Sequence, residues 1–141
     1  MKKVVYISIT SFLLHVVWEN VHAPLYSVYE SFTQHFIPCF IATFGDVAIT
    51  LSVYGTISLL KRNVTWIMDL NKKDIFALIV ISFFVAVWIE QHALFIGKWG
   101  YASSMPIIPY FDVGLTPILQ MVILLPLSLY LTGKFIKKTI N

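Results

Sequence analysis

The chain has 141 residues, of which 58% are hydrophobic and 12% are charged, and its formal net charge is +3. A typical soluble domain is roughly 45–50% apolar and about 25% charged, so this composition excludes an ordinary soluble domain. The basic residues form no patch with interleaved aromatic residues, which excludes a nucleic-acid partner. We expect a single domain over residues 1–141, and the lone cysteine, Cys39, excludes an internal disulfide.

Four long apolar segments follow one another along the chain, at residues 4–22, 36–60, 75–96 and 113–131. Each is near or above the ~20 residues that a helix needs to cross a hydrocarbon core of ~30 Å. The alternation of polar and apolar residues that is typical of a membrane β-barrel is absent from the sequence. The predicted fold class is therefore all-α integral membrane, a bundle of four transmembrane helices.

The first segment has a second interpretation, as a cleaved signal peptide. Two lysines would form its basic start, and residues 21–23 loosely resemble a cleavage site. Pro24 directly after that site argues against cleavage, and so do His15 and Glu19, which interrupt the apolar run. We therefore expect a helix that stays in the membrane.

Basic residues are distributed unevenly around the four segments. Only Lys98 lies in the loops 23–35 and 98–112; the other nine are Lys2, Lys3, Lys61, Arg62, Lys72, Lys73, Lys134, Lys137 and Lys138. The positive-inside rule places both termini and the loop 61–74 in the cytoplasm, and the loops 23–35 and 98–112 outside. We expect a multi-pass protein of the cell membrane with an N-in/C-in topology.

Both outer loops are rich in aromatic residues and proline, among them Trp99, Tyr101 and Tyr110. One interpretation is a belt of Trp and Tyr at the membrane interface. The other is a lid, in which residues 105–109 dip back over a cavity, because irregular backbone at that depth is tolerated only where protein or water covers it.

Polar side chains inside the segments are the candidates for function, because inserting an ionisable group into a membrane costs about 2.5–3.5 kcal/mol. Three of them, His15, Glu19 and His22, share one face of a helix. A rise of ~1.5 Å per residue places polar residues of all four segments at a similar outer depth: His15, Glu19, His22, Asp46, Glu90, His92 and Gln120. The sequence therefore predicts a pocket that opens outward.

No Lys or Arg lies within a segment, so the buried carboxylates must be protonated, paired with histidine or bound to a metal ion. We expect the catalytic residues to be His15, Glu19, Asp46 and Glu90. The residues expected to contact a substrate are His22, Trp88, His92, Tyr101, Met105 and Gln120. For Gln120 the competing interpretation is structural, an interhelical hydrogen bond worth about 0.6 kcal/mol on average.

No cofactor is expected, although two alternatives stay open. His15, Glu19 and His22 could ligate one divalent metal ion from a single helical face, but their spacing is not the zinc motif HExxH. A haem between His92 and either His15 or His22 is the other alternative.

The stretch His15-Val-Val-Trp-Glu19, followed by Leu25-Tyr26 and Tyr29-Glu30, resembles the His-x-x-x-Glu helix of the EXPERA group. These four-helix membrane domains include the emopamil-binding-protein sterol isomerases, in which His and Glu residues shuttle a proton to move a ring double bond. The resemblance covers about sixteen residues and the four-span layout. It implies that His15 and Glu19 form the first-helix pair and that an acid on a later helix assists. The last segment departs from the family, with Gln120 and no Trp where an Asn and a Trp are expected.

The leading hypothesis is an isomerase-type membrane enzyme that uses acid/base chemistry on a lipid or isoprenoid. Glu19 and Glu90 would be proton donor and acceptor, and His15 would orient or relay. One alternative is a non-enzymatic carrier or binding protein for a lipid, a metal ion or protons. Another is an accessory subunit whose polar face meets a membrane partner, and a homo-oligomer also stays open.

Overall fold

The computed structural model describes residues 2–140, and most of them are helical. The four main helices are α1 (Lys2–His22), α2 (Phe32–Leu60), α3 (Lys72–Phe95) and α4 (Leu115–Ile140). Two short 3-10 helices, η1 (Ala23–Leu25) and η2 (Trp66–Asp69), and a hairpin of β1 (Ile107–Ile108) and β2 (Val113–Gly114) lie in the connections. All four main helices are long and apolar enough to cross a membrane, which confirms the prediction of four long apolar helices.

The helix boundaries differ from the expected ones because local contacts extend or shorten each apolar segment. The α2 helix begins early because the Ser31 side chain accepts a hydrogen bond from the Gln34 backbone and caps the helix. A capping box of Asn71 and Asp74 likewise starts α3 at Lys72. The α4 helix begins two residues late because residues 113–114 pair with 107–108 as antiparallel strands.

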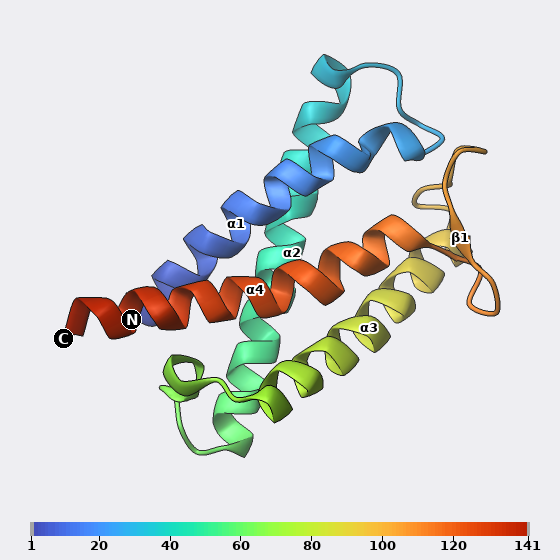
Figure 1. The fold of residues 1–141 in the computed structure, drawn as a ribbon. Coiled ribbons are helices and arrows are strands. Elements are labelled where there is room, and N and C mark those ends of the chain that lie inside the picture. Colours follow the sequence, from blue (N-terminus) through green and yellow to red (C-terminus); the bar gives the residue numbers. More distant parts are fainter. Residues whose placement is uncertain (1, 141) are drawn as a thin grey trace.

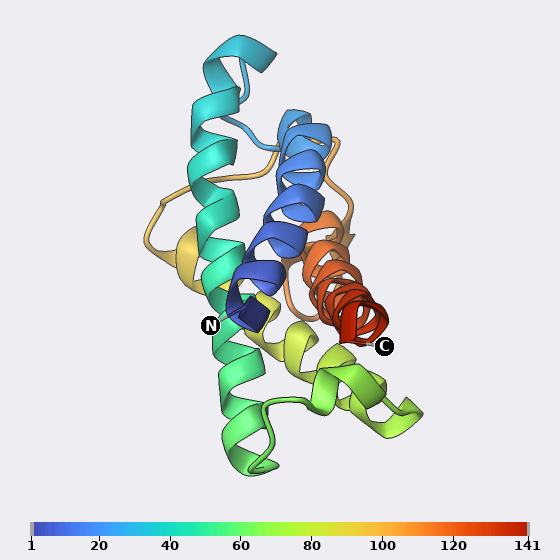
Figure 2. The same cartoon turned by 90° about the vertical axis from the view of Figure 1, so that its left-hand side faces the viewer.

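The helices are arranged in the order α2, α1, α4, α3, so that the chain forms two antiparallel hairpins joined through α1 and α4. Figure 1 shows α2 and α3 diverging from the loop that connects them, and in Figure 2 the last turns of α3 pass behind α2; these two helices hardly pack against each other. The α4 helix, which packs on both α1 and α3, is the most buried of the four. The bundle is therefore open along the side between α2 and α3.

Small and hydroxyl side chains form the helix contacts, as is typical of membrane bundles. On α1 the buried stripe contains Ile7, Ser11 and His15, and the Ser11 hydroxyl donates to Thr50 Oγ1 on α2 at 3.2 Å. On α3 the buried positions include Ser82. These positions recur at helical spacing, so they lie along one face of the helix. The remaining faces carry exposed apolar side chains, as a lipid environment requires.

The two ends of the molecule differ in charge. At one end lie the termini and residues 61–74, with nine Lys or Arg and two Asp. There the rings of Tyr6 and Phe135 contact each other with centroids 5.1 Å apart. At the other end the loops that follow α1 and α3 meet through the backbone bridge between Tyr26 and Tyr101. This second end holds five acidic residues and a single lysine, Lys98.

Candidate functional site

A cavity of about 700 Å³ lies between α2 and α3, in the half of the molecule that is distant from the termini. Its apolar wall includes Ile41, Ala42, Ile49, Ala86, Ile89 and Met121. Its polar wall includes Glu19 and His22 from α1, Asp46 from α2, Glu90 from α3 and Gln120 from α4. The cavity follows from the divergence of α2 and α3, which exposes the inner seam of α1 and α4 to the space between them.

Gln120 lies at the centre of the polar wall and is only 2% exposed. Its amide Nε2 lies 2.8 Å from Glu19 Oε1, 2.9 Å from Asp46 Oδ2 and 3.1 Å from His15 Nδ1. A primary amide has two N–H groups, so it serves two of these three acceptors at a time. The two N–H groups of the amide are both used when Gln120 donates to Glu19 and to Asp46. His15 Nδ1–H then donates to Asp46 Oδ2, which lies 3.3 Å away.

His22 contacts the opposite side of Glu19. Its Nε2 lies 3.6 Å from Glu19 Oε2, and its Nδ1 lies 3.3 Å from the Thr116 hydroxyl on α4. The two oxygens of Glu19 therefore face different partners, an amide donor on one side and an imidazole on the other. This arrangement gives Glu19 a neighbour that can give or take a proton, next to the open cavity.

Glu90 forms a second polar group on the α3 side of the cavity and is 6% exposed. Both Trp99 Nε1, at 3.3 Å, and the Tyr101 hydroxyl donate to the same carboxylate oxygen, Oε2. Burial, together with the bond to Glu90, raises the pKa of the Tyr101 phenol. Burial and the nearby carboxylates Glu90 and Glu19 raise the pKa of Tyr26 in the same way. Both phenols therefore stay protonated at neutral pH.

Several residues expected to contact a substrate lie elsewhere. Trp88 and His92 stack on the outside of α3, and Trp88 is 67% exposed. They are four residues apart and share one face of the helix. Glu90 lies between them and is rotated by roughly 200° about the helix axis from Trp88, so it faces the cavity. The structure does not bring Trp88 or His92 to the cavity.

Three more of the expected residues lie behind the cavity wall. His15 is fully buried beneath Gln120, and Tyr101 reaches the site only through Glu90. Met105 packs against Gly114 and accepts a hydrogen bond from Thr116 at its sulfur. Residues 105–109 contribute to the hairpin and do not line the cavity, so the structure does not place them as a lid over it.

Other residues line the cavity that the sequence did not single out. Trp99 lines the cavity and donates to Glu90, whereas the sequence suggests it for an interfacial belt or a lid. Its position two residues before Tyr101, which was expected at the site, is the signal that could have identified it. His35 was expected in a loop but lies in the first turn of α2, at the cavity rim. Cys39 also lines the cavity, is 4% exposed, and its Sγ–H donates to the Glu19 carbonyl oxygen at 3.5 Å.

The metal alternative depends on the geometry of the same side chains. Within residues 2–140, no group of three or more His, Cys, Asp or Glu side chains is placed to hold a metal ion. His15, Glu19 and His22 share a face, but His15 is directed to Asp46 and Gln120 whereas His22 is directed to Thr116.

Comparisons of the chain with protein-family models, with curated proteins and with solved structures gave no match.

Proposed function

We propose that the chain is a multi-pass membrane enzyme that moves a proton on a lipid or isoprenoid held in the cavity. The observation that carries this proposal is the placement of Glu19, Asp46 and Glu90 on the wall of an otherwise mostly apolar cavity of about 700 Å³. Large apolar pockets with a few convergent polar groups are typical of small-molecule sites. In this proposal both termini lie in the cytoplasm and the cavity lies in the outer half of the membrane.

Glu19 and Glu90 are the proposed proton donor and acceptor. Glu19 exchanges its proton with His22, 3.6 Å away, while Gln120 fixes the position of its other oxygen. Both hydrogen bonds to Glu90 end on Oε2, so Oε1 is the oxygen that Glu90 offers to a molecule in the cavity. If one carboxylic acid protonates a carbon of a double bond and the other carboxylate removes a neighbouring proton, the double bond moves and the composition of the ligand is unchanged.

The divergence of α2 and α3 supports a ligand that comes from the bilayer. The cavity walls on these two helices are mostly apolar, and Ile41 of α2, which lines the cavity, is 64% exposed. A ligand with an apolar body would thus remain in an apolar environment along its whole path into the site.

A non-enzymatic lipid-binding protein is the second candidate, and the cavity itself favours it equally. Transport of protons or ions is less well supported, because the polar groups described on the terminal side of Asp46 are hydroxyls such as Ser11, Thr50 and Ser58. The role of an accessory subunit would place the polar residues on the lipid-facing surface, whereas His15, Glu90 and Gln120 are buried inside the chain.

Deuterium incorporation tests the enzymatic proposal without requiring an identified substrate. The purified protein would be incubated in D₂O with a total lipid extract of the producing cells, and the lipids would be analysed by mass spectrometry. We expect one lipid species to gain carbon-bound deuterium with the wild type and with Asp112→Asn, which removes an exposed carboxylate of the same end outside the cavity.

Glu19→Gln should abolish this incorporation and still retain bound lipid in native mass spectrometry. A folded Glu19→Gln variant with full incorporation would contradict the proposal. Bound lipid without incorporation in the wild type would favour the binding protein.

A further inference from the structure

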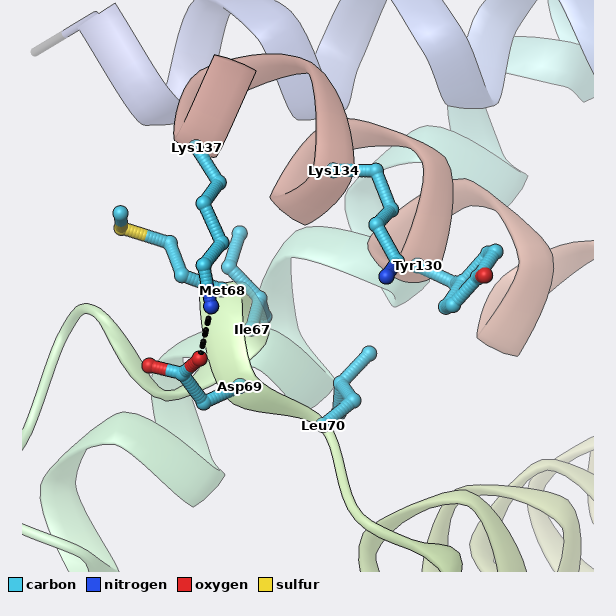
Figure 3. Close-up of a pocket in the computed structure, with 7 residues that line it drawn as sticks. All are labelled: Ile67, Met68, Asp69, Leu70, Tyr130, Lys134 and Lys137. Atoms are coloured by element: carbon cyan, nitrogen blue, oxygen red, sulfur yellow. Dashed lines mark hydrogen bonds and ion pairs between the residues drawn. The ribbon is translucent and has the colours of Figure 1, made fainter. Parts of the chain in front are cut away.

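A second pocket lies at the end of the molecule that carries the termini, between η2 and the last turns of α4 (Figure 3). Its volume is about 280 Å³, and it is lined by Ile67, Met68, Asp69, Leu70, Tyr130 and two lysines of α4. The backbone of η2 rests directly on Gly133, where a Cβ atom would lie 1.9 Å from the Ile67 carbonyl oxygen. This close contact holds the two sides of the pocket at a fixed separation. The proposed function makes no use of this pocket.

The two lysines of the pocket have different partners, as Figure 3 shows. Lys137 Nζ lies 2.5 Å from Asp69 Oδ1, so its charge is compensated. Lys134 Nζ lies 5.5 Å above the ring of Tyr130, and no carboxylate within residues 2–140 forms an ion pair with it. The pocket therefore holds one uncompensated positive charge beside a phenol, and both groups can donate a hydrogen bond.

The position of Lys134 along α4 matches the depth of lipid phosphates. Lys134 follows Gln120 by fourteen residues, which is roughly 21 Å along the helix axis. With the cavity in one half of a hydrocarbon core of ~30 Å, this places Lys134 near the opposite boundary of the core. The neighbouring Leu131 and Phe135 are 40% and 53% exposed and would contact acyl chains.

We propose that this pocket binds the phosphate group of an anionic phospholipid, with Lys134 as the ion partner and the Tyr130 hydroxyl as a second donor. Basic pockets between helices at the cytoplasmic boundary are suited to acidic lipid headgroups. The excess of basic residues at this end of the molecule would attract such lipids, and the pocket would select one of them by direct contact. This proposal is independent of the chemistry in the large cavity.

Native mass spectrometry from mixed micelles of phosphatidylglycerol and phosphatidylcholine tests it. We expect the wild type to retain phosphatidylglycerol preferentially and Lys134→Gln to lose about five-fold of that preference, which corresponds to the ~1 kcal/mol of one basic residue near an anionic surface. Lys73→Gln removes the same charge from the same end outside the pocket and should change retention less than two-fold. Equal losses in both variants, or no loss in Lys134→Gln, would overturn the proposal.

A variant that should increase the retention of phosphatidylglycerol provides a stricter test. Asp69→Asn removes a negative charge from the pocket wall and releases Lys137, so retention of phosphatidylglycerol should rise. Asp112→Asn changes the net charge equally at the other end and should have no effect. A rise in neither variant, or an equal rise in both, contradicts the proposal. Displacement of phosphatidylglycerol by millimolar inorganic phosphate would identify free phosphate as the ligand and overturn the lipid assignment.

Discussion

The amide nitrogen of Gln120 on α4 lies 2.8 Å from the carboxylate of Glu19 on α1, although 101 residues separate them in the sequence. This bond joins the two helical hairpins at the wall of the cavity. Because the amide is neutral, it holds the carboxylate in place without compensating its charge. Gln120 is thus a donor that Glu19 and Asp46 share, beside the histidine that each of them contacts.

Replacing this amide should affect stability and function together. Gln120→Leu removes the donor that two partly buried carboxylates share and leaves Asp46 with His15 and Glu19 with His22, so we expect a loss of about 1–3 kcal/mol in the free energy of unfolding. Proposed deuterium incorporation should fall at least ten-fold. Thermal unfolding in detergent and the D₂O assay measure the two effects. Gln91→Leu is the matched control, because Gln91 is exposed and its side chain donates to the Phe111 carbonyl, away from both carboxylates. Similar losses in both variants would contradict the central role of Gln120.

The contact between η2 and α4 predicts opposite effects at two helical glycines. Gly133→Ala would place a Cβ atom 1.9 Å from the Ile67 carbonyl oxygen, so the backbone must shift, at a cost of about 1–3 kcal/mol. At Gly55 nothing lies within 4 Å of the new atom. Gly55→Ala should therefore stabilise α2 by about 0.5–1 kcal/mol. Thermal unfolding of the two variants compares the signs, and a stabilised Gly133→Ala would show that η2 does not rest on α4.

Tyr101 predicts a specific loss of stability in alkali. Its pKa is raised in the folded protein by burial and by the bond to Glu90, so the folded state keeps a proton that the unfolded chain releases above pH ~10. The stabilising contribution is present below pH ~10 and is lost as the pH rises further. We expect the wild type to lose stability more steeply than Tyr101→Phe above this pH, as measured by denaturation midpoints. Parallel curves would mean that Tyr101 ionises normally.

Cysteine labelling tests the topology. Asn63 and Ser103 are exposed at opposite ends of the molecule, and the native Cys39 is 4% exposed. In intact cells a membrane-impermeant maleimide should label Ser103→Cys but neither Asn63→Cys nor the wild type. After the cells are opened, Asn63→Cys should be labelled as well. The reverse pattern would place the termini outside.

The long apolar segments made the four long apolar helices predictable, because a membrane selects for length and hydropathy in each segment independently. The start of α4 was not predictable from that signal, since residues 113–114 leave the helix to pair with 107–108. Such pairing depends on the position of another segment and leaves no trace in local hydropathy.

The height of the candidate site along the helices was predictable, but the face of each helix that is turned toward the interior was not. Counting residues along each helix gave the height of Glu19, Asp46, Glu90 and Gln120, and helical periodicity placed His15, Glu19 and His22 on one face. Which face of α3 meets the interior was not determined by that count, so Trp88 and His92 were expected at the site although they lie outside it. The order of the helices, which decides this, depends on packing among all four.

The divergence of α2 and α3 has a consequence for kinetics. In a closed bundle, a molecule from the bilayer must wait until two packed helices separate. Here the helix pairs that hold the structure together, α1 with α2, α1 with α4 and α3 with α4, all remain in contact while the side of the cavity is open. Residence time in the cavity would then depend on the affinity of the ligand itself, with no slow opening motion of the protein to limit its entry or release.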